Sequence, residues 1–345
     1  MRGEYYFFPM TTAALPVRVG LAGATGYAGQ ELIRLLARHP RFVLTHATGS
    51  PAATATRRLP ALARVWDGDV VPLDVPALAA ASDVVFLALP EAASAELAPA
   101  LLEAGCRVVD LSGAFRLRDD RARARWYPAT GALPDGVAYG LTEFEADAIR
   151  RARLLSNPGC YPTAALLALL PLTRAGLLSE HAEPVIDAKS GLSGAGKAPT
   201  DRTHFCENHG SVAAYGAFHH RHTPEMVQAL GGRSVTFVPH LVPLDRGLMA
   251  TVHVRLTPGT SQAALTDAFA RAYASAPFVR VTGTTLPEIK DVVHTNFCDI
   301  GWAFDAETDR LCVVSVIDNL VKGAAGQALQ NANLMYDVDE RAGLL

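Results

Sequence analysis

VRVGLAGATGYAG, which spans residues 17–29, starts as a run of β-branched and apolar residues and ends in closely spaced glycines. Residues 17–22 predict a strand, and the apolar spacing over 29–38 predicts a helix. Between a first strand and a first helix, glycines let a dinucleotide pyrophosphate meet backbone N–H groups and the positive helix end. The glycines at 23, 26 and 29 follow GxxGxxG, a variant of the usual GxGxxG, so a tight turn without a ligand is the alternative interpretation.

The elements after this turn repeat its strand-to-helix rhythm. Three further apolar runs predict strands, with alanine-rich helical stretches before and between them, at residues 42–47, 84–89 and 107–111. This alternation predicts a parallel, doubly wound sheet of the Rossmann type. Later apolar runs are mostly bounded by Gly and Pro and predict a mixed or antiparallel sheet, with strands at 185–188, 234–238, 249–256, 279–281 and 311–317.

The chain has 345 residues, enough for two domains, because single cores stop growing at roughly 250 residues. The rhythm breaks at NPG, residues 157–159, and a second domain begins there. Small and apolar residues at helical spacing over 324–336 predict a helix that could return to the first domain. We therefore predict an α/β protein that begins with a flexible extension at residues 1–16. A Rossmann-like NADP-binding domain is expected at residues 17–158 plus 319–345. An α+β catalytic and oligomerisation domain with a mixed sheet is expected at residues 159–318.

Composition argues against several functional classes. With 31 basic and 34 acidic residues the net charge is -3, without the basic excess that would attract nucleic acid. No run of about 20 apolar residues predicts a membrane span. The five cysteines contain no CxxC pair, which indicates a reduced, cytoplasmic protein, and no Cys and His residues have a recognised zinc spacing, so we expect no metal.

The end of the second strand favours NADP(H) over NAD(H). An NAD site usually has Asp or Glu there to hold the ribose diol, whereas this strand ends HATGS over residues 46–50. A 2′-phosphate would be repelled by a carboxylate, and here hydroxyls such as that of Ser50 and a cation from Arg57 or Arg58 can bind it. The alternative is that both arginines are solvated surface charges.

Cys160 lies directly before an apolar helix predicted at 164–170, where the helix dipole would lower the thiol pKa and favour a nucleophilic thiolate. The other four cysteines are interpreted as small buried hydrophobes. A cysteine nucleophile needs a group that moves protons, and the candidates in the second domain are His220, His222 and His240. Sequence alone does not choose among them.

Two arginines lie where a substrate anion could be held. Arg116 follows the fourth strand, at the carboxyl end of the sheet where such folds bind ligands, and Arg246 lies in PLDRG. The alternative for each is a surface ion pair. A second glycine-rich loop, SGLSGAGK at 190–197, lacks the full spacing of a Walker loop and either approaches a nicotinamide or phosphate or forms a mobile turn.

Taken together, these stretches resemble the N-acetyl-γ-glutamyl-phosphate reductase family of arginine biosynthesis over nearly the whole chain from Val17. The motifs that carry the resemblance are GATGYAGQEL at 23–32, DLSGAFRL at 110–117, NPGCYPTA at 157–164, KSGLSGAGK at 189–197, HHRHTPEM at 219–226, PHLVPLDRG at 239–247 and DNLVKGAAGQALQN at 318–331.

The resemblance implies that Cys160 attacks an acyl phosphate, that phosphate leaves, and that NADPH reduces the resulting thioester through a thiohemiacetal. It selects His222 as acid/base and places Arg116 on the phosphate and Asn319 near the nicotinamide. We expect substrate contacts from Arg116, Ser190, His220, His240 and Arg246. We expect cofactor contacts from Gly23, Thr25, Gly26, Tyr27, Ala28, Ser50, Ser112, Gly191 and Asn319. A homo-oligomer, dimer or tetramer, is the expected assembly.

Three other functions are weighed against this one. A related branch reduces a carrier-bound aminoadipyl phosphate in lysine biosynthesis, but CYPT at 160–163 and PHLVPLDRG resemble the acetylglutamyl enzymes more closely. An enzyme similar to aspartate-semialdehyde dehydrogenase would take a shorter acyl phosphate. A non-catalytic NADP-binding sensor would have no need of Cys160 as a nucleophile.

Overall fold

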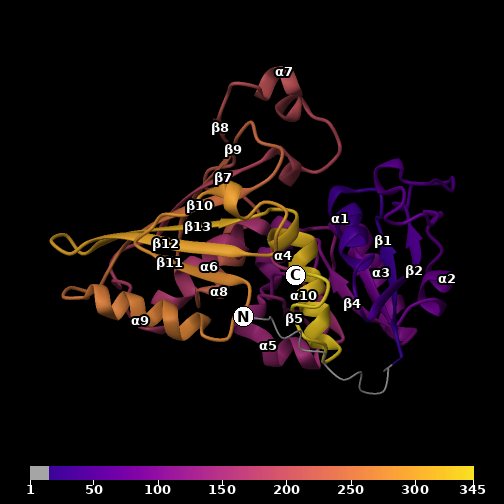
Figure 1. The fold of residues 1–345 in the computed structure, drawn as a ribbon, viewed down its shortest axis with the longest axis horizontal. Coiled ribbons are helices and arrows are strands. Elements are labelled where there is room, and N and C mark those ends of the chain that lie inside the picture. The colour runs from indigo at the N-terminus through magenta and orange to yellow at the C-terminus, as the bar shows by residue number, and fades with distance from the viewer. Residues whose placement is uncertain (1–14) are drawn as a thin grey trace, which may run out of the picture.

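The first part of the chain forms a six-stranded parallel sheet in a computed structural model that describes residues 15–345. The strands pair in the order β2-β1-β3-β4-β6-β5, and every neighbouring pair is parallel. Figure 1 shows this sheet on the right of the molecule. Its strands are β1 Val17–Ala22, β2 Phe42–Thr48, β3 Val84–Leu87, β4 Arg107–Asp110, β5 Ala138–Tyr139 and β6 Leu154–Ser156.

Helices cover both faces of this sheet, as a doubly wound fold requires. Successive side chains of β3 point to opposite faces, so Val84 and Phe86 join one core and Val85 and Leu87 the other. The helices of the first core are α1 Tyr27–Leu36, α5 Thr142–Arg151 and α10 Gly326–Met335, and those of the second are α2 Val75–Ala80 and α3 Glu91–Glu103. The predicted Rossmann-type sheet is confirmed.

The second sheet has seven strands in the order β11-β12-β13-β10-β7-β9-β8 and mixes parallel with antiparallel pairs. Its core lies against three helices, which Figure 1 shows below the sheet. The strands are β7 Val185–Ser190, β8 Ala213–Ala214, β9 Thr236–Leu241, β10 Leu248–Arg255, β11 Val279–Gly283, β12 Cys298–Asp305 and β13 Arg310–Ile317. The three helices are α6 Cys160–Arg174, α8 Thr223–Ala229 and α9 Gln262–Tyr273.

Helix α6 is longer than predicted at both ends. It begins at Cys160, because Pro162 falls in the first turn, where no intrahelical N–H is needed. It also continues through Pro171, which has no N–H to donate to the carbonyl of Leu167. The hydroxyl of Tyr273, from α9, donates to that carbonyl instead. A tertiary contact therefore satisfies the acceptor that Pro171 leaves open.

Four strands were not predicted. β5, β6 and β8 have only two or three residues each, too few to show a period. β12 has the sequence CDIGWAFD, in which Asp299 and Gly301 interrupt the apolar pattern. It is nevertheless paired along its whole length with β13, and Trp302 stacks on Phe269 of α9 with ring centroids 4.7 Å apart. Tertiary packing outweighs the weak local signal here.

The chain returns to the first sheet at its C-terminal end. A short π-helical turn, Val321–Ala325, leads into α10, whose Ala328, Leu329 and Ala332 lie in the core with α1. Lys322 in that turn is fully buried and paired with Glu143 of α5 at 2.5 Å. The domain boundaries at 158/159 and 318/319 stay predictions, and the proposed extension falls almost wholly on residues 1–14, outside the described part.

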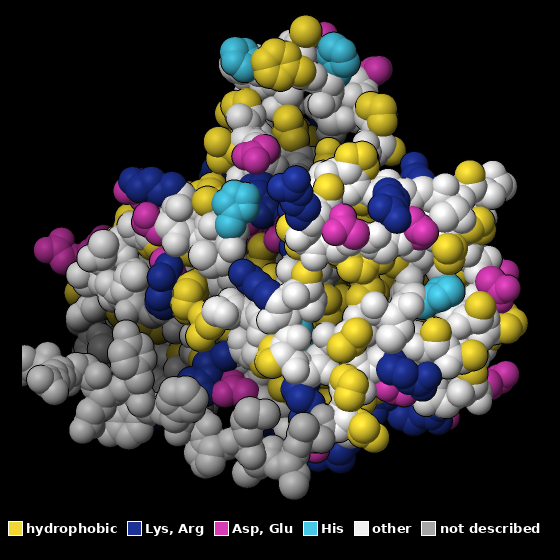
Figure 2. Space-filling model, turned by 45° about the vertical axis from the view of Figure 1, so that its right-hand side comes forward, with side chains coloured by type: hydrophobic (Ala, Val, Ile, Leu, Met, Phe, Trp, Pro, Cys, Tyr) yellow, Lys and Arg dark blue, Asp and Glu magenta, His cyan; other side chains and the backbone are white. Residues whose placement is uncertain are grey.

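Residues 198–219, called the arm below, stand above the second sheet and contain the short helix α7 Phe205–Asn208 (Figure 1). Apolar and histidine side chains gather at the upper end of the molecule in Figure 2. Phe205, Val212 and Phe218 of the arm are each at least 60% exposed. The remaining short helices are α4 Asp120–Trp126 and the 3₁₀ turns Pro60–Leu62, Leu192–Ala195, Asp201–Thr203 and Ile289–Asp291. Within residues 15–345, no helix is both long and apolar enough to span a membrane.

Candidate active site

The glycine turn after β1 is shaped for close backbone approach. Gly23 has φ +91°, and a Cβ there would lie 2.2 Å from the carbonyl oxygen of Ala88. A Cβ at Gly29 would lie 2.3 Å from the Gly23 oxygen, whereas Gly26 is open. Gly26 is the N-cap of α1 and supplies no side-chain cap. Within the described residues the N–H groups of Tyr27 and Ala28 have no partner, so the positive helix end is available to a phosphate.

The end of β2 carries no carboxylate. Ser50 follows the strand and is partly exposed, and the carbonyl of Thr48 accepts hydrogen bonds from the N–H groups of Gly23 and Ala24. Arg58 pairs with Asp69 at 3.2 Å on the surface, as the alternative interpretation expected. Arg57 is exposed, and its backbone pairs with Val70, whose neighbour Val71 pairs with Thr48 at the end of β2.

Cys160 opens onto a cavity of about 230 Å³, called the cysteine cavity below, together with His222 and Ser190. Its position is set by two glycines. Gly159 precedes it as the N-cap of α6, and a Cβ on Gly323 would lie 2.8 Å from the Cys160 Cβ. The π-helical turn therefore packs directly on the cysteine.

The net pKa shift of this thiol is upward, opposite in direction to the effect expected from the helix dipole alone. Burial raises the pKa of Cys160 to about 11, although the Arg116 charge and a hydrogen bond from the Tyr161 N–H act in the opposite direction. The free-energy cost of removing the thiolate from water is larger than the stabilisation that these two groups give it. Cys160 therefore rests as a thiol and needs a base to become a nucleophile.

His222 lies against the turn that precedes Cys160 and lines the same cavity. A Cβ on Gly159 would lie 2.5 Å from His222 Nε2, so only glycine before Cys160 lets the imidazole come this close. Burial, followed by the Arg116 charge, lowers the pKa of His222 well below its ordinary value. The ring is therefore neutral. Because Arg116 Nη1 can only donate, its 3.3 Å contact to Nε2 puts the ring proton on Nδ1, which has no partner among the described residues.

His220 supports this arrangement from the same cavity. Its Nδ1 accepts the backbone N–H of His222 at 3.2 Å, and the two rings are 4.8 Å apart. Burial lowers the pKa of His220 to about 4. His240 behaves differently, because it contacts Asp187 at 3.4 Å and the Ala188 carbonyl at 3.3 Å and does not line the cysteine cavity. Its predicted substrate contact is not seen in this conformation.

Glu225 is a buried residue that sequence analysis missed. Its Oε1 accepts the Tyr139 hydroxyl at 2.7 Å and the Gly159 N–H at 2.8 Å, and its Oε2 lies 3.5 Å from Arg116 Nη1. Glu225 thus holds both the turn before Cys160 and the arginine beside His222. A glutamate in the first turn of α8 is typical of any helix start, so its sequence position gave no signal.

Arg116 is committed to the protein more fully than predicted. Besides Glu225 and His222, its guanidinium donates to the carbonyls of Asn157 and Leu111 at 2.9 and 3.0 Å. Ser112, expected to bind the cofactor, donates instead to the buried Asp110 at 2.8 Å. Both side chains brace the carboxyl end of β4.

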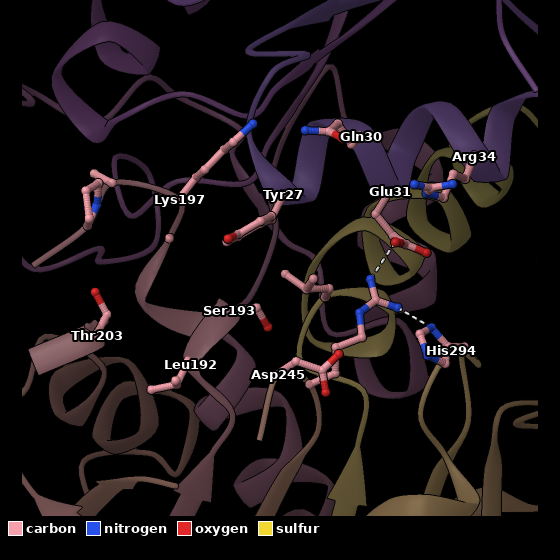
Figure 3. A pocket seen from close by; sticks show the side chains of 15 residues that line it. Tyr27, Gln30, Glu31, Arg34, Leu192, Ser193, Lys197, Thr203, Asp245 and His294 are labelled. Carbon is pink, nitrogen blue, oxygen red and sulfur yellow. Dashed lines mark hydrogen bonds and ion pairs between the residues drawn. The ribbon is translucent and has the colours of Figure 1, made fainter. Parts of the chain in front are cut away.

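The loop 190–197 forms the wall between two cavities. Ser190 and Gly194 line the cysteine cavity, whereas Ser193 and Lys197 line a cavity of about 770 Å³ beside α1, called the nucleotide-side cavity below (Figure 3). Lys197 Nζ donates to the Thr25 carbonyl in the glycine turn at 3.2 Å. The loop therefore connects the turn with the cysteine.

Asn319 and Gly191 hold this loop against the segment that contains Arg246 and Gly247. Asn319 accepts the Gly247 N–H at 2.7 Å and donates to Ser193 Oγ at 2.9 Å. Gly191 packs so closely on Arg246 that a Cβ would lie 2.9 Å from its backbone. Neither residue lines the nucleotide-side cavity itself, and their predicted cofactor contacts stay predictions.

Arg246 lies at the nucleotide-side cavity and not beside Cys160. It pairs with Glu31 of α1 at 2.5 Å and with Asp318 at 3.3 Å, and it contacts His294 at 2.6 Å. Glu31 and His294 are labelled in Figure 3, where a dashed line from each marks its contact with Arg246. Its predicted substrate contact is not supported by this arrangement, in which it joins α1 to the end of β13.

Two further arginines line the cysteine cavity, Arg202 from the arm and Arg221 from the turn before α8. Both are exposed. Arg221 lies between the two predicted histidines, and Arg202 lies in an ordinary polar loop, so only folding marks them. Among residues 15–345, no group of three or more His, Cys, Asp or Glu side chains is arranged to hold a metal ion.

Comparison with known proteins assigns the class. The family model described as semialdehyde dehydrogenase, NAD binding domain, matches residues 18–152, and the one described as semialdehyde dehydrogenase, dimerisation domain, matches 160–319. The fold is similar to aspartate semialdehyde dehydrogenase II from Vibrio cholerae, with TM-score 0.72 and 19% identity over 94% of this chain and 99% of that one. It is also similar to the Candida albicans aspartate semialdehyde dehydrogenase with NADP, with TM-score 0.67 and 16% identity over 93% and 98%.

The chain belongs to the N-acetyl-gamma-glutamyl-phosphate reductase family. The relative from Shouchella clausii is 46% identical over 95% of this chain and 98% of its own length. The Geobacillus stearothermophilus relative is 45% identical with the same coverage. The predicted resemblance is confirmed, and the family carries a nicotinamide-binding domain.

Proposed function

We propose that this chain reduces N-acetyl-γ-glutamyl phosphate to N-acetylglutamate 5-semialdehyde and phosphate with NADPH, a step of arginine biosynthesis. One observation carries the proposal: the loop 190–197 separates the cysteine cavity from the nucleotide-side cavity, so that a nucleophile and a hydride donor can meet across it. The names of the relatives supply the substrate.

Cys160 is the proposed nucleophile and His222 its base. Neutral His222 takes the thiol proton as Sγ attacks the acyl carbon, the carbon–oxygen bond to phosphate breaks, and the departing phosphate receives that proton. This transfer is needed because the pKa of Cys160 is about 11, raised by burial. Arg221, which lines the cavity, is the cation available to the phosphate, and Arg116 adds positive charge beside Nε2.

A dinucleotide fits the glycine turn, because Gly26 leaves the helix end open and Tyr27 and Ala28 present unpaired N–H groups. When bound, the reduced nicotinamide supplies the hydride that turns the Cys160 thioester into a thiohemiacetal. His222, after regaining a proton from solvent once phosphate has left, donates it to the developing alkoxide. Collapse of the thiohemiacetal then releases the aldehyde and transfers the hydroxyl proton back to the Cys160 sulfur. For NADP over NAD, the support is the carboxylate-free end of β2 with Ser50 and Arg57 beside it.

The test is a steady-state assay in the oxidative direction with N-acetylglutamate semialdehyde, aspartate semialdehyde and an aminoadipate analogue, each with phosphate and either NADP or NAD. We expect turnover with the first substrate and NADP. Cys160→Ala should abolish that turnover and keep NADP binding, and His222→Asn should lower it by about 10²-fold or more. Full turnover by Cys160→Ala, or equal loss in His240→Asn, would contradict the assigned roles.

We also propose that the chain assembles as a homodimer or tetramer through its second sheet. The support is that the dimerisation-domain model matches residues 160–319, which contain that sheet. Light scattering after size-exclusion chromatography measures the assembly directly. A monomer at micromolar concentration would refute this part of the proposal.

A further inference from the structure

The substrate of the proposed reaction has negative charge at both ends. The phosphate lies on the acyl carbon that Cys160 attacks, and the α-carboxylate lies four carbon–carbon bonds away, roughly 5 Å in an extended chain. A cavity that recognises the whole molecule therefore needs a second cation, separate from the one that meets the phosphate. Binding a carboxylate in a confined site without such a partner is costly.

Two of the predicted anion-binding arginines are not available for this task. Arg116 is buried against Glu225 and donates to two backbone carbonyls. Arg246 lies at the nucleotide-side cavity and is paired with Glu31 and Asp318. The α-carboxylate must therefore be recognised by another group.

The cysteine cavity offers Arg202 and Arg221 and, within the part of the chain described, no carboxylate lines it. Arg221 adjoins His222 and lies 3.7 Å from Glu91 at the start of α3. Its charge lowers the pKa values of both Cys160 and His222, though less than Arg116 does. Arg221 thus belongs to the end of the cavity where the phosphate leaves.

Arg202 lines the same cavity from the arm. It lies in the 3₁₀ turn Asp201–Thr203 of the arm, and its guanidinium lies over the Tyr215 ring, 5.3 Å from the centroid. Among residues 15–345 it forms no ion pair. A guanidinium supported by an aromatic face keeps its planar edge available for a carboxylate.

We propose that Arg202 binds the α-carboxylate of the substrate, held in place by Tyr215, and so determines specificity for an N-acylated amino acid over a neutral acyl chain. The inference rests on the proposed function, because that function supplies the carboxylate. It assigns a substrate-recognition role to the arm, whose helix α7 stands at the top of the molecule in Figure 1.

The experiment compares N-acetylglutamate semialdehyde with 4-acetamidobutanal, the same aldehyde without the α-carboxylate, in phosphate- and NADP-dependent oxidation. For Arg202→Ala we expect kcat/KM to fall about 10- to 100-fold with the first substrate, mainly through KM, as for loss of a charge-assisted hydrogen bond. With 4-acetamidobutanal we expect a change below about twofold. Arg202→Lys should recover part of the loss, since lysine keeps the charge but not the planar fork.

Arg151→Ala is the matched control, because Arg151 is exposed at the end of α5 and lines neither cavity. Equal losses with both aldehydes, or a wild-type enzyme that does not distinguish them, would overturn the role of Arg202 and leave the proposed function intact. No wild-type turnover of N-acetylglutamate semialdehyde would instead overturn the function itself and this role with it. Should 4-acetamidobutanal react too slowly to measure, inhibition constants of N-acetylglutamate and 4-acetamidobutanoate give the same comparison.

Discussion

Glu225→Gln removes the carboxylate charge that lies 3.5 Å from the buried Arg116 guanidinium. The amide oxygen can still accept from Tyr139 and Gly159, so the two hydrogen bonds of Oε1 are kept. The charge compensation is lost, and breaking a buried ion pair in this way costs about 3–5 kcal/mol. Because the hydrogen bonds survive, we expect a loss of unfolding free energy near the lower limit, about 3 kcal/mol.

Urea unfolding followed by tryptophan fluorescence measures this loss, since Trp302 is buried in the core that α8 shares. The control is Glu96→Gln, an exposed glutamate of α3 that we expect to change stability by less than about 0.5 kcal/mol. We also expect kcat to fall about 10-fold or more, because Arg116, which contacts His222, loses the carboxylate charge that holds it in place. NADP affinity should not change, because Glu225 is remote from the glycine turn.

A stability loss in Glu225→Gln no larger than that in Glu96→Gln would refute the reasoning. It would mean that the Arg116 charge is compensated by groups other than Glu225. A parallel loss of NADP affinity would contradict it in another way, by showing that the substitution disturbs the first sheet as well.

Three further predictions follow from particular contacts. Burial raises the pKa of Cys160 to about 11, so in free enzyme the thiolate fraction and the rate of iodoacetamide alkylation should rise about tenfold per pH unit up to pH 10. Mass spectrometry measures the alkylation, with Cys160→Ala as the control. A rate that reaches a plateau below pH 8 would contradict this prediction. Tyr273→Phe leaves the carbonyl of Leu167 without its donor, and should cost about 1–3 kcal/mol in urea unfolding with kcat unchanged. Gly23→Ala places a Cβ 2.2 Å from a backbone oxygen at φ +91°. It should lower the free energy of unfolding by about 1–3 kcal/mol and weaken NADPH binding in a fluorescence titration. Gly26→Ala, whose Cβ would have no neighbour nearer than 3.6 Å, should stay folded.

The predictable part of the fold is the part with a strong local period. β1, β3 and β4 are short, apolar and separated by helical stretches, and the parallel sheet they form was predicted from that pattern alone. β12 was missed because Asp299 and Gly301 break its alternation, and its strand conformation depends on pairing with β13. The full length of α6 likewise depends on a donor from another helix.

The residues of the site also differ in whether the sequence could predict them. Cys160 and His222 could be selected because their residue types carry chemistry and their motifs carry a family resemblance. Glu225 acts through a hydrogen bond to a turn sixty-six positions earlier in the sequence. The local spacing of residue types does not predict contacts between segments so far apart in the chain. The surroundings of Arg246 could not be predicted for a similar reason: a lone arginine in a loop shows its charge, but its carboxylate partners come from α1 and the end of β13.

The wall between the two cavities is a single short loop held by Asn319 and by Lys197. A molecule bound on either side reduces the conformational freedom of that loop, so the second molecule orders less of it on arrival. Thermodynamic linkage then requires that coenzyme tighten substrate binding by the same factor by which substrate tightens coenzyme binding. The loop that lines both cavities thus also makes the binding of substrate and the binding of coenzyme interdependent.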